Sequence, residues 1–405
     1  MQKTVLFVGA GRHQRRAIRR AKELGLRVGA VDGTPGALGL AEADVPRVVD
    51  FSDVEGVLAA VADVELDGVM TISADRAVPV VAAVAEARGL PGIGVETAHR
   101  MTHKVAMRRA LAEAGVPQPR FAAVRGLSER RRAADEVGFP AVLKPADSGG
   151  QRGVFRVDSV DDIEAHLHEV LAASPTGEAI LEEFVDGTEM NGIVVMRRGE
   201  AIPLTLSDRR RPPGVGFGVG WMHVYPPTID PDQLVEAERV AGHTARALGL
   251  ETGIAFPQLI AARDGRVVVV ECAARVPGGE MARLVWHAVG VDIVEVQIRM
   301  ALGDDLPDEL VLPKLSQPLA VRFFTASPGP LPTGRVVRTP SLEKVEAFPG
   351  VVEAGSYIEA GEVIRPVRVD NDRRGYVIAV APTNLEALER AEAAATLVDV
   401  EVEPA

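Results

Sequence analysis

The first 96 residues alternate short apolar runs with helical patterns, and this alternation restricts the folds that the chain can adopt. Residues 5–10 read VLFVGA, an apolar strand, and the helical pattern after them ends at Gly25. A second strand-like run ends at Asp32, and a third, GVMTIS at residues 68–73, precedes an apolar helical run. Strands that alternate with helices form parallel sheets with helices on both faces. We therefore predict a doubly wound α/β domain over residues 1–96.

The segment GAGRHQ at residues 9–14 contains half of a dinucleotide-binding fingerprint. The full fingerprint needs a third glycine where Gln14 stands, and a lone GxG after a strand is also the ordinary form of a tight turn. We favour the turn and do not predict NAD.

Composition and charge exclude several classes of protein. With 405 residues, 47% of them hydrophobic, the chain can form about two to four packed units. The net charge of −12 disfavours a nucleic-acid surface, which requires clustered positive charge. No apolar run approaches the roughly 20 residues that span a bilayer, the start lacks the apolar core of a signal peptide, and the single Cys272 excludes an internal disulfide. We expect a cytoplasmic globular protein with no nucleic-acid or membrane partner.

Residues 142–157, VLKPADSGGQRGVFRV, run from an apolar strand into a lysine and then into a glycine-rich loop. Gly149, Gly150 and Gly153 leave backbone N–H groups accessible, and Lys144 adds a positive charge at the end of the strand. Bare amide groups beside a cation suit a phosphate. The pattern predicts a phosphate-binding loop.

The residues around this loop read as an α+β region. A helix capped near Thr97 and ended by Gly115 precedes the loop, and a helix over residues 161–172 follows it. Two strands around a turn at residues 186–187 come next. The Gly- and Pro-rich segment 209–227 has too many special backbone positions for a plain strand, so it is either a functional loop or a variable surface loop.

Two further strand-like runs, at residues 253–261 and 266–273, are separated by the turn sequence RDG. Pairing of these runs places Gln258 and Glu271 where they can face each other. Paired oxygen ligands suit Mg²⁺, which usually binds through one or two protein carboxylates and the phosphates of a substrate.

Taken in order, Lys104, LKPADSGGQRGV at 143–154, EEFVDGTE at 182–189 and ECAARVPGG at 271–279 make the chain resemble the ATP-grasp superfamily. The resemblance covers nearly the whole chain and is strongest to the carboxylate–amine ligases, including the L-amino-acid (dipeptide) ligases. It implies an α/β and α+β protein with the ATP-grasp fold in four parts: a doubly wound preATP-grasp domain (1–96), a linker helix and small lid subdomain (97–186), a catalytic subdomain (187–305) and a C-terminal cap (306–405).

The resemblance also implies roles for individual residues. Lys104 and Lys144 would contact the ATP phosphates, and Lys144 would take part in catalysis. The other ATP-binding residues would be Ser148, Gly149 and Gly150 in the lid over the phosphates, Glu182, Glu183, Phe184 and Val185 beside the adenine, and Glu189 at the ribose hydroxyls.

Glu271 and Gln258 would bind Mg²⁺ or Mn²⁺. Many relatives have a glutamate at the position of Gln258 and an asparagine at the position of Ala273. These departures leave open whether water replaces the missing ligand, whether the affinity for the metal is lower, or whether another residue contributes.

Arg275 would be the catalytic residue that stabilises the acyl phosphate and the tetrahedral intermediate, because a guanidinium matches a planar anion. A structural salt bridge is the alternative account of this arginine. Gly278, Gly279 and His223 complete the predicted substrate site, although the two glycines could also serve only as a turn.

The implied reaction transfers the γ-phosphoryl group of ATP to a carboxylate, and an amine then displaces phosphate to form an amide. By this resemblance the substrates are amino acids, and their identity is not specified by the sequence. A bicarbonate-activating carboxylase of the biotin-carboxylase or purine-pathway type and a non-catalytic ATP-binding regulator are the alternatives. A homodimer is usual among proteins of this kind.

Overall fold

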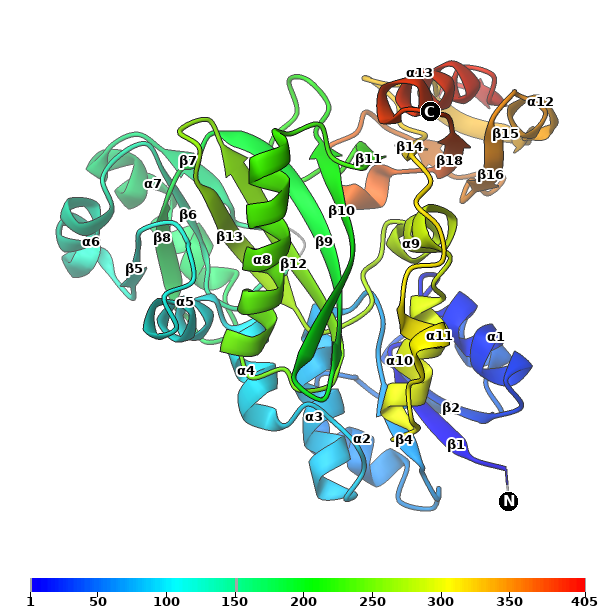
Figure 1. The fold of residues 1–405 in the computed structure, drawn as a ribbon, viewed down its shortest axis with the longest axis horizontal. Coiled ribbons are helices and arrows are strands. Elements are labelled where there is room, and N and C mark those ends of the chain that lie inside the picture. Colours follow the sequence, from blue (N-terminus) through cyan, green and yellow to red (C-terminus); the bar gives the residue numbers. More distant parts are fainter. Residues whose placement is uncertain (1, 150–151, 405) are drawn as a thin grey trace.

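The computed structural model describes residues 2–149 and 152–404, and its first unit is a parallel sheet (Figure 1). The strands lie in the order β3-β2-β1-β4, namely β1 (Thr4–Val8), β2 (Arg27–Asp32), β3 (Val45–Val48) and β4 (Gly68–Met70). Helices α1 (Arg15–Glu23), α2 (Val54–Ala60) and α3 (Val78–Ala87) cover it. The predicted doubly wound arrangement is confirmed, but β3 and α2 were missed because both are short and each has a single buried residue.

The GAGRHQ segment forms the turn from β1 into α1. Gly9 adopts a φ of 93°, which favours glycine. The buried Gln14 side chain fills the space beside Gly9 and Gly11, and its amide nitrogen donates to the Ile72 carbonyl at 2.7 Å. The segment is therefore the tight turn that we favoured.

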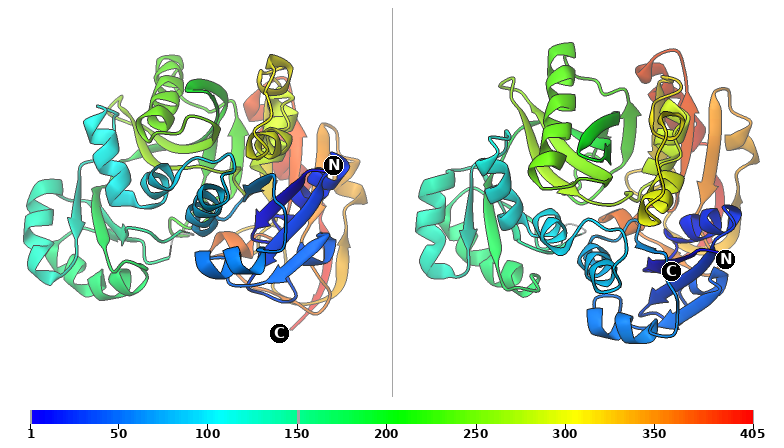
Figure 2. Two further views of the ribbon diagram at one scale, coloured as in Figure 1. Left: turned by 90° about the horizontal axis from the view of Figure 1, so that it is seen from below. Right: turned by 60° about the horizontal axis from the view of Figure 1, so that its bottom comes forward.

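The second unit is a four-stranded antiparallel sheet in the order β5-β8-β6-β7. Its strands are β5 (Phe121–Val124), β6 (Ala141–Pro145), β7 (Phe155–Val157) and β8 (Ala179–Glu183). Helices α6 (Arg130–Val137) and α7 (Val160–Ala172) pack on this sheet through a small apolar core. This unit, called the lid unit below, lies at one end of the molecule, and α4 (Val95–Thr102) and α5 (Lys104–Glu113) lead into it (Figures 1 and 2).

The largest sheet has eight strands in the order β13-β12-β9-β10-β11-β14-β18-β16. They are β9 (Gly187–Arg197), β10 (Glu200–Arg210), β11 (Met222–Tyr225), β12 (Gly253–Ala262), β13 (Val267–Ala273), β14 (Leu319–Phe323), β16 (Val351–Ser356) and β18 (Gly375–Val380). The predicted boundary at residue 306 falls between β13 and β14, which are strands of one continuous sheet. The predicted domain boundaries stay predictions.

Side chains of β9 alternate between two apolar cores, as a strand period of two requires. Val194 and Met196 pack with α8 (Pro231–Ala247), whereas Ile193 and Val195 face α9 (Met281–Val289) and α10 (Ile293–Ala301). The second of these cores also contains residues of β1 and α1. The first unit is therefore fastened to the large sheet by one shared core.

The C-terminal residues add a third layer of packing on the outer strands of the large sheet. Helix α13 (Asn384–Ala395) packs on β14 and β18, and a small sheet of β15 (Gly334–Ser341), β17 (Val363–Ile364) and β19 (Asp399–Glu403) completes the region. The short helices α11 (Asp308–Val311) and α12 (Glu343–Glu346) lie in the connections. No helix in the described ranges is long and apolar enough to cross a membrane.

Two local predictions were wrong. The single helix predicted from Thr97 is two helices, because His103 adopts an extended backbone and its ring accepts a hydrogen bond from the Ala106 N–H at the start of α5. The predicted loop at 209–227 is shorter, because Arg209 still belongs to β10 and residues 222–225 form β11, which pairs with β10.

The first residue of β9, Gly187, provides a stability test of the fold. A Cβ atom on Gly187 would lie 2.7 Å from the Cα of Ala262 and would also overlap the Ala261 carbonyl, both in the neighbouring β12. Because backbone cannot move aside cheaply, we expect Gly187→Ala to lower the free energy of unfolding by about 1–3 kcal/mol in urea denaturation. Gly126→Ala, where nothing lies within 4 Å of the added atom, is the control and should leave stability nearly unchanged. Equal effects of the two substitutions would contradict this packing.

Candidate active site

A cavity of about 430 Å³ lies where the lid unit, the large sheet and the first unit meet. All predicted site residues line it, except Gly150, which lies outside the described residues: Lys104, Lys144, Ser148, Gly149, Glu182, Glu183, Phe184, Val185, Glu189, His223, Gln258, Glu271, Arg275, Gly278 and Gly279. The structure thus brings together residues that are up to 175 positions apart, from Lys104 to Gly279. Their individual roles stay predictions.

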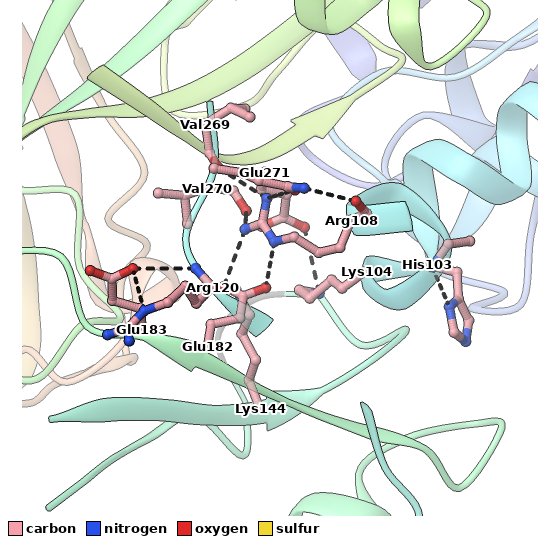
Figure 3. Close-up of polar contacts among 12 residues, drawn as sticks. His103, Lys104, Arg108, Arg120, Lys144, Glu182, Glu183, Val269, Val270 and Glu271 are labelled. Carbon is pink, nitrogen blue, oxygen red and sulfur yellow. Dashed lines mark hydrogen bonds and ion pairs between the residues drawn. The ribbon is translucent and has the colours of Figure 1, made fainter. Parts of the chain in front are cut away.

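Two lysines face the predicted phosphate region from different elements. Lys104 is the first residue of α5, and its Nζ donates to the Ser148 carbonyl at 2.9 Å and lies 3.5 Å from Glu271 Oε1 (Figure 3). Lys144 lies on β6, and its Nζ is 2.7 Å from Glu182 Oε2. Lys104 therefore links the loop after β6 to Glu271 near the end of β13. Lys144 is held on the sheet of the lid unit by its contact with Glu182.

Glu182 is bound from two sides in a buried charge cluster. Besides Lys144, Arg108 on α5 contacts Glu182 Oε1 through Nε at 2.9 Å, and Arg108 also donates to the Val269 carbonyl at 3.0 Å (Figure 3). All three side chains are at most 8% exposed. Burial alone would raise the pKa of Glu182, but the two cations outweigh it and lower that pKa to about 2. Burial, the largest effect on Lys144, lowers the pKa of its ammonium.

Arg108 was not identified from the sequence. It lies one helical turn after Lys104 on the buried face of α5. The next residue, Arg109, is exposed, so the position on the helix face is what distinguishes the two arginines. A long cation on the apolar face of a helix is a sign of a buried partner.

The predicted nucleotide-base region is formed by the end of β8 and the start of β9. Phe184 and Val185 line the cavity, and the ring of Phe217, from the loop between β10 and β11, lies 6.2 Å from that of Phe184. Arg211 stacks over Phe217 at 5.0 Å. The Gly- and Pro-rich loop between β10 and β11 therefore lines this end of the cavity.

Three predicted ATP-binding glutamates are already engaged with arginines. Glu189 is bound by Arg209 at 2.7 Å and Arg211 at 3.0 Å, and Glu183 by Arg266 at 3.1 Å. Glu182 has its carboxylate in the buried cluster, and its backbone is flanked by β5 and β6. Arg209 and Arg211 are further wall residues that the sequence analysis left unassigned.

The predicted metal ligands lie on adjacent strands. Gln258 and Glu271 are direct partners in the β12–β13 register, which confirms that they face each other. Asn191 of β9 is the partner of Gln258 on the other side. Asn191 is 3% exposed, and its Oδ1 has no hydrogen-bond partner among the described residues. One carboxylate and two amide oxygens thus share one face of the sheet, the face opposite α8.

Arg275 forms the salt bridge that was the alternative account of this residue, and it also has one nitrogen that, among the described residues, is free to bind a ligand. Its Nε and Nη2 bind Asp75 Oδ1 of the first unit at 2.8 and 2.6 Å. Its buried Nη1 has no hydrogen-bond partner in the part of the chain that the structure describes. Because an unsatisfied buried donor is costly, this atom marks a place where a ligand oxygen can bind.

His223 lies on the cavity wall and is 3% exposed. Its Nδ1 is 3.5 Å from Asn191 Nδ2, and its ring packs edge-on against Phe323. Burial, followed by the nearby charges of Arg373 and Arg209, lowers the pKa of this histidine to about 3. The ring is therefore neutral at pH 7.

Fold and site together define an ATP-grasp enzyme. The family model described as "Carbamoyl-phosphate synthase L chain, ATP binding domain" matches residues 103–309, half of the chain, and "L-amino acid ligase C-terminal domain 2" matches residues 327–403. The chain belongs to this ATP-binding family, and within the ATP-grasp superfamily it belongs to the carboxylate–amine ligases. The predicted resemblance and fold class are confirmed.

Curated relatives share less than a third of their residues with this chain. The uncharacterized protein y4rH of Sinorhizobium fredii is 29% identical over 321 residues, 78% of this chain and 64% of that protein. A formate-dependent phosphoribosylglycinamide formyltransferase of Ignicoccus hospitalis is 26% identical over 98% of this chain and 95% of its own. An alanine–anticapsin ligase of Bacillus subtilis is 29% identical over 52% of this chain and 49% of its own length. The chain thus spans less than two thirds of the first and third of these relatives.

Solved structures show the same fold. The L-amino acid ligase of Bacillus licheniformis has a TM-score of 0.83 at 20% identity, with 99% of both chains covered. The phosphoribosylglycinamide synthetase of Anaerococcus prevotii has a TM-score of 0.81 at 21% identity, with both chains fully covered. At these identities the likeness establishes the architecture and not the substrate.

The buried cluster predicts a pH-dependent stability. Glu182→Gln leaves Arg108 and Lys144 without an anion, so we expect the free energy of unfolding at pH 7 to fall by about 3–5 kcal/mol. The folded pKa of Glu182, about 2, lies below the ordinary value of 4.5. The stabilisation is therefore complete above about pH 5 and disappears as the pH falls towards 2.

Urea denaturation of wild type and variant at several pH values measures this effect. The difference between them should narrow from pH 5 to pH 2, whereas Glu55→Gln, at an exposed position of α2, should show little difference at any pH. A gap that stays constant down to pH 2 would show that folding does not lower the pKa of Glu182.

Proposed function

We propose that the protein is an ATP-dependent ligase that joins the carboxylate of one amino acid to the amine of another through an acyl phosphate, releasing ADP and phosphate. The observation that carries the proposal is one cavity that runs from two buried lysines, past a carboxylate–amide pair, to Arg275, whose Nη1 has no partner among the described residues. The match of residues 327–403 to a C-terminal domain of L-amino acid ligases supports amino acids as substrates.

ATP binding uses the lid side of the cavity. The adenine lies against Phe184 and Val185 under Phe217, and the phosphates extend towards Lys104 and Lys144. Two cations, with the amide groups of the glycine-rich loop, offset the charge on the transferred phosphoryl group. Because Lys144 already has an anionic partner in Glu182, it enters the phosphate site in a fixed position and not as a mobile surface side chain.

The residues present fit a hard divalent cation. Glu271 supplies one anionic oxygen, Gln258 an amide oxygen opposite it, and Asn191 a buried oxygen that lacks a partner. Mg²⁺ or Mn²⁺ bound there with ATP would neutralise phosphate charge during transfer. The Asn191 oxygen supports the option, left open by Ala273, that another residue contributes, because it offers a third protein donor from another strand.

Bond changes follow from this arrangement. An oxygen of the donor carboxylate forms a bond to the γ-phosphorus while the bond to the β-phosphate oxygen breaks, and ADP leaves. The amine nitrogen then bonds to the acyl carbon and loses a proton, and phosphate departs with the oxygen that it shared with that carbon. Arg275 Nη1 donates to the developing oxyanion, while Asp75 fixes the guanidinium in place.

A first test measures phosphate release from ATP with each of the twenty amino acids, singly and in pairs, followed by mass spectrometry. A product with the mass of two amino acids less one water supports the proposal. Formate and bicarbonate are tested as carboxylates in parallel, because the relative that matches nearly the whole chain is formate-dependent. Amine-independent ATP cleavage with bicarbonate, or ATP binding without cleavage in every mixture, would favour the two alternative functions.

Removal of the lid-unit lysine tests the phosphate assignment. Lys144→Ala should lower the turnover number at least about 100-fold, because a buried cation is removed from the transferred group. The exposed Lys344→Ala in the C-terminal region is the control and should keep normal turnover. Wild-type turnover in Lys144→Ala would remove the phosphate assignment.

The metal assignment makes a separate prediction. Glu271→Gln removes the single anionic ligand, so the Mg²⁺ concentration for half-maximal rate should rise at least about tenfold, with the melting temperature nearly unchanged. Binding of Mn²⁺ with a non-hydrolysable ATP analogue, followed by paramagnetic resonance, should weaken in parallel. The exposed Glu359→Gln is the control, and an unchanged metal requirement in Glu271→Gln would place the ion elsewhere.

A further inference from the structure

A second cavity, of about 270 Å³, lies beside the first. The two cavities share His13, Ser73, Pro277, Gly278 and Gly279 as a common wall. The second cavity is built from three regions of the chain: the turn before α1 and the first turns of that helix, the residues that follow β13, and two tyrosines of the C-terminal region, Tyr357 and Tyr376. We call it the side chamber.

Positive charge dominates the lining of the side chamber. Arg12, Arg15, Arg16, Arg19 and Arg283 all line it. Arg15 and Arg19 are both paired with Glu42 at 2.6 Å. These two pairs leave the charges of Arg12, Arg16 and Arg283 to be explained.

Arg283 is also engaged. It lies 3.2 Å from Glu280 Oε2 and contacts Glu353. The same two carboxylates accept hydrogen bonds from the hydroxyl groups of Tyr357 and Tyr376, respectively. The acidic groups at the chamber are therefore already bound by internal donors.

Arg12 and Arg16 differ from the other arginines of the chamber. Neither has a hydrogen bond or an ion pair with any of the described residues. The guanidinium of Arg12 lies 5.6 Å from the centre of the Tyr357 ring. Arg16, in the first turn of α1, lines the chamber from the side of that helix. Two exposed cations that have no anionic partner among the described residues thus border a concave site, where one anionic ligand can contact both.

The position of the chamber indicates which substrate carries that anion. Lys104, Lys144 and Glu271 line the first cavity but not the chamber. The carboxylate that receives the phosphoryl group must lie near them, in the first cavity. The chamber adjoins that cavity at Gly278 and Gly279, three and four residues after Arg275, so it is placed to hold the attacking partner.

We propose that Arg12 and Arg16 bind the carboxylate of the acceptor, so that the acceptor is an α-amino acid or a similar carboxylate-bearing amine. Its amino group then points past Gly278 and Gly279 towards Arg275. The proposal rests on the ligase function above and assigns the residues that hold the carboxylate of its acceptor. The chamber volume suits a small metabolite, being below the range of drug-sized sites.

The aromatic wall supports the same acceptor. Tyr357 and Tyr376 have ring centres 6.0 Å apart and belong to the segment that matches the C-terminal domain of L-amino acid ligases. Their hydroxyl groups are bound to glutamates, and Arg12 and Arg283 lie over one side of the Tyr357 and Tyr376 rings, respectively, so the remaining ring surface is what they offer to a ligand. An apolar side chain of the acceptor can pack there while its carboxylate reaches the arginines.

The experiment compares each acceptor amino acid with its carboxamide, which keeps the amine and lacks the negative charge. Arg12→Gln and Arg16→Gln should each lower kcat/KM for the carboxylate form about tenfold or more, and the double variant should lower it further. The carboxamide should be a poor substrate of the wild type and should be affected by the substitutions less than threefold. Lys22→Gln, which removes a positive charge from the same helix away from the chamber, is the matched control and should behave as wild type.

A binding measurement that needs no turnover separates this inference from the ligase proposal. If the wild type forms no amide with any pair, the ligase function fails, and saturation-transfer NMR then tests whether amino acids bind and whether the double variant loses them. Equal losses for carboxylate and carboxamide, or unchanged kinetics and binding, would overturn the chamber assignment. Tighter binding of O-phosphoethanolamine than of any amino acid would replace the carboxylate by a phosphate and would overturn it as well.

Discussion

The paired charges of Arg108, Glu182 and Lys144 are the interaction on which the site depends. Each charge is buried and would destabilise the fold without an opposite charge, so Glu182 and the two cations stabilise one another. Arg108 also binds the backbone carbonyls of Val269 and Val270, next to Glu271. One cluster therefore fixes the lid strand β8, the helix that begins with Lys104 and the metal-side strand β13 relative to one another.

Much of this arrangement could be predicted from the sequence, because the signals are local. The alternation of strands and helices in the first unit, the strand–lysine–glycine run and the facing of Gln258 and Glu271 across a short turn each depend on residues close in the chain. The predicted site residues within the described ranges line one cavity, and most of them lie at or near the end of a strand or helix, whereas Gln258 lies in the middle of β12.

What could not be predicted depends on residues far apart in the chain. Asp75 binds Arg275 across 200 positions, and Arg108 binds Glu182 across 74. Asn191 is an ordinary polar residue of a strand until the register places it beside Gln258. The wrong single helix near Thr97 has a different cause, because the sequence pattern continues through His103 while the backbone does not.

The continuity of the large sheet across β11 and β14 also bears on how such enzymes diversify. The segment that matches the L-amino acid ligase domain, 327–403, starts after β14 and contains β16 and β18. Strand β14 precedes this segment and pairs with β18, and β18 in turn pairs with β16. The segment that carries these two outer strands also carries the two tyrosines of the side chamber. Exchange of that segment next to β14 would change the two tyrosines of the side chamber and leave the predicted ATP-binding residues, all of which precede β14, in place.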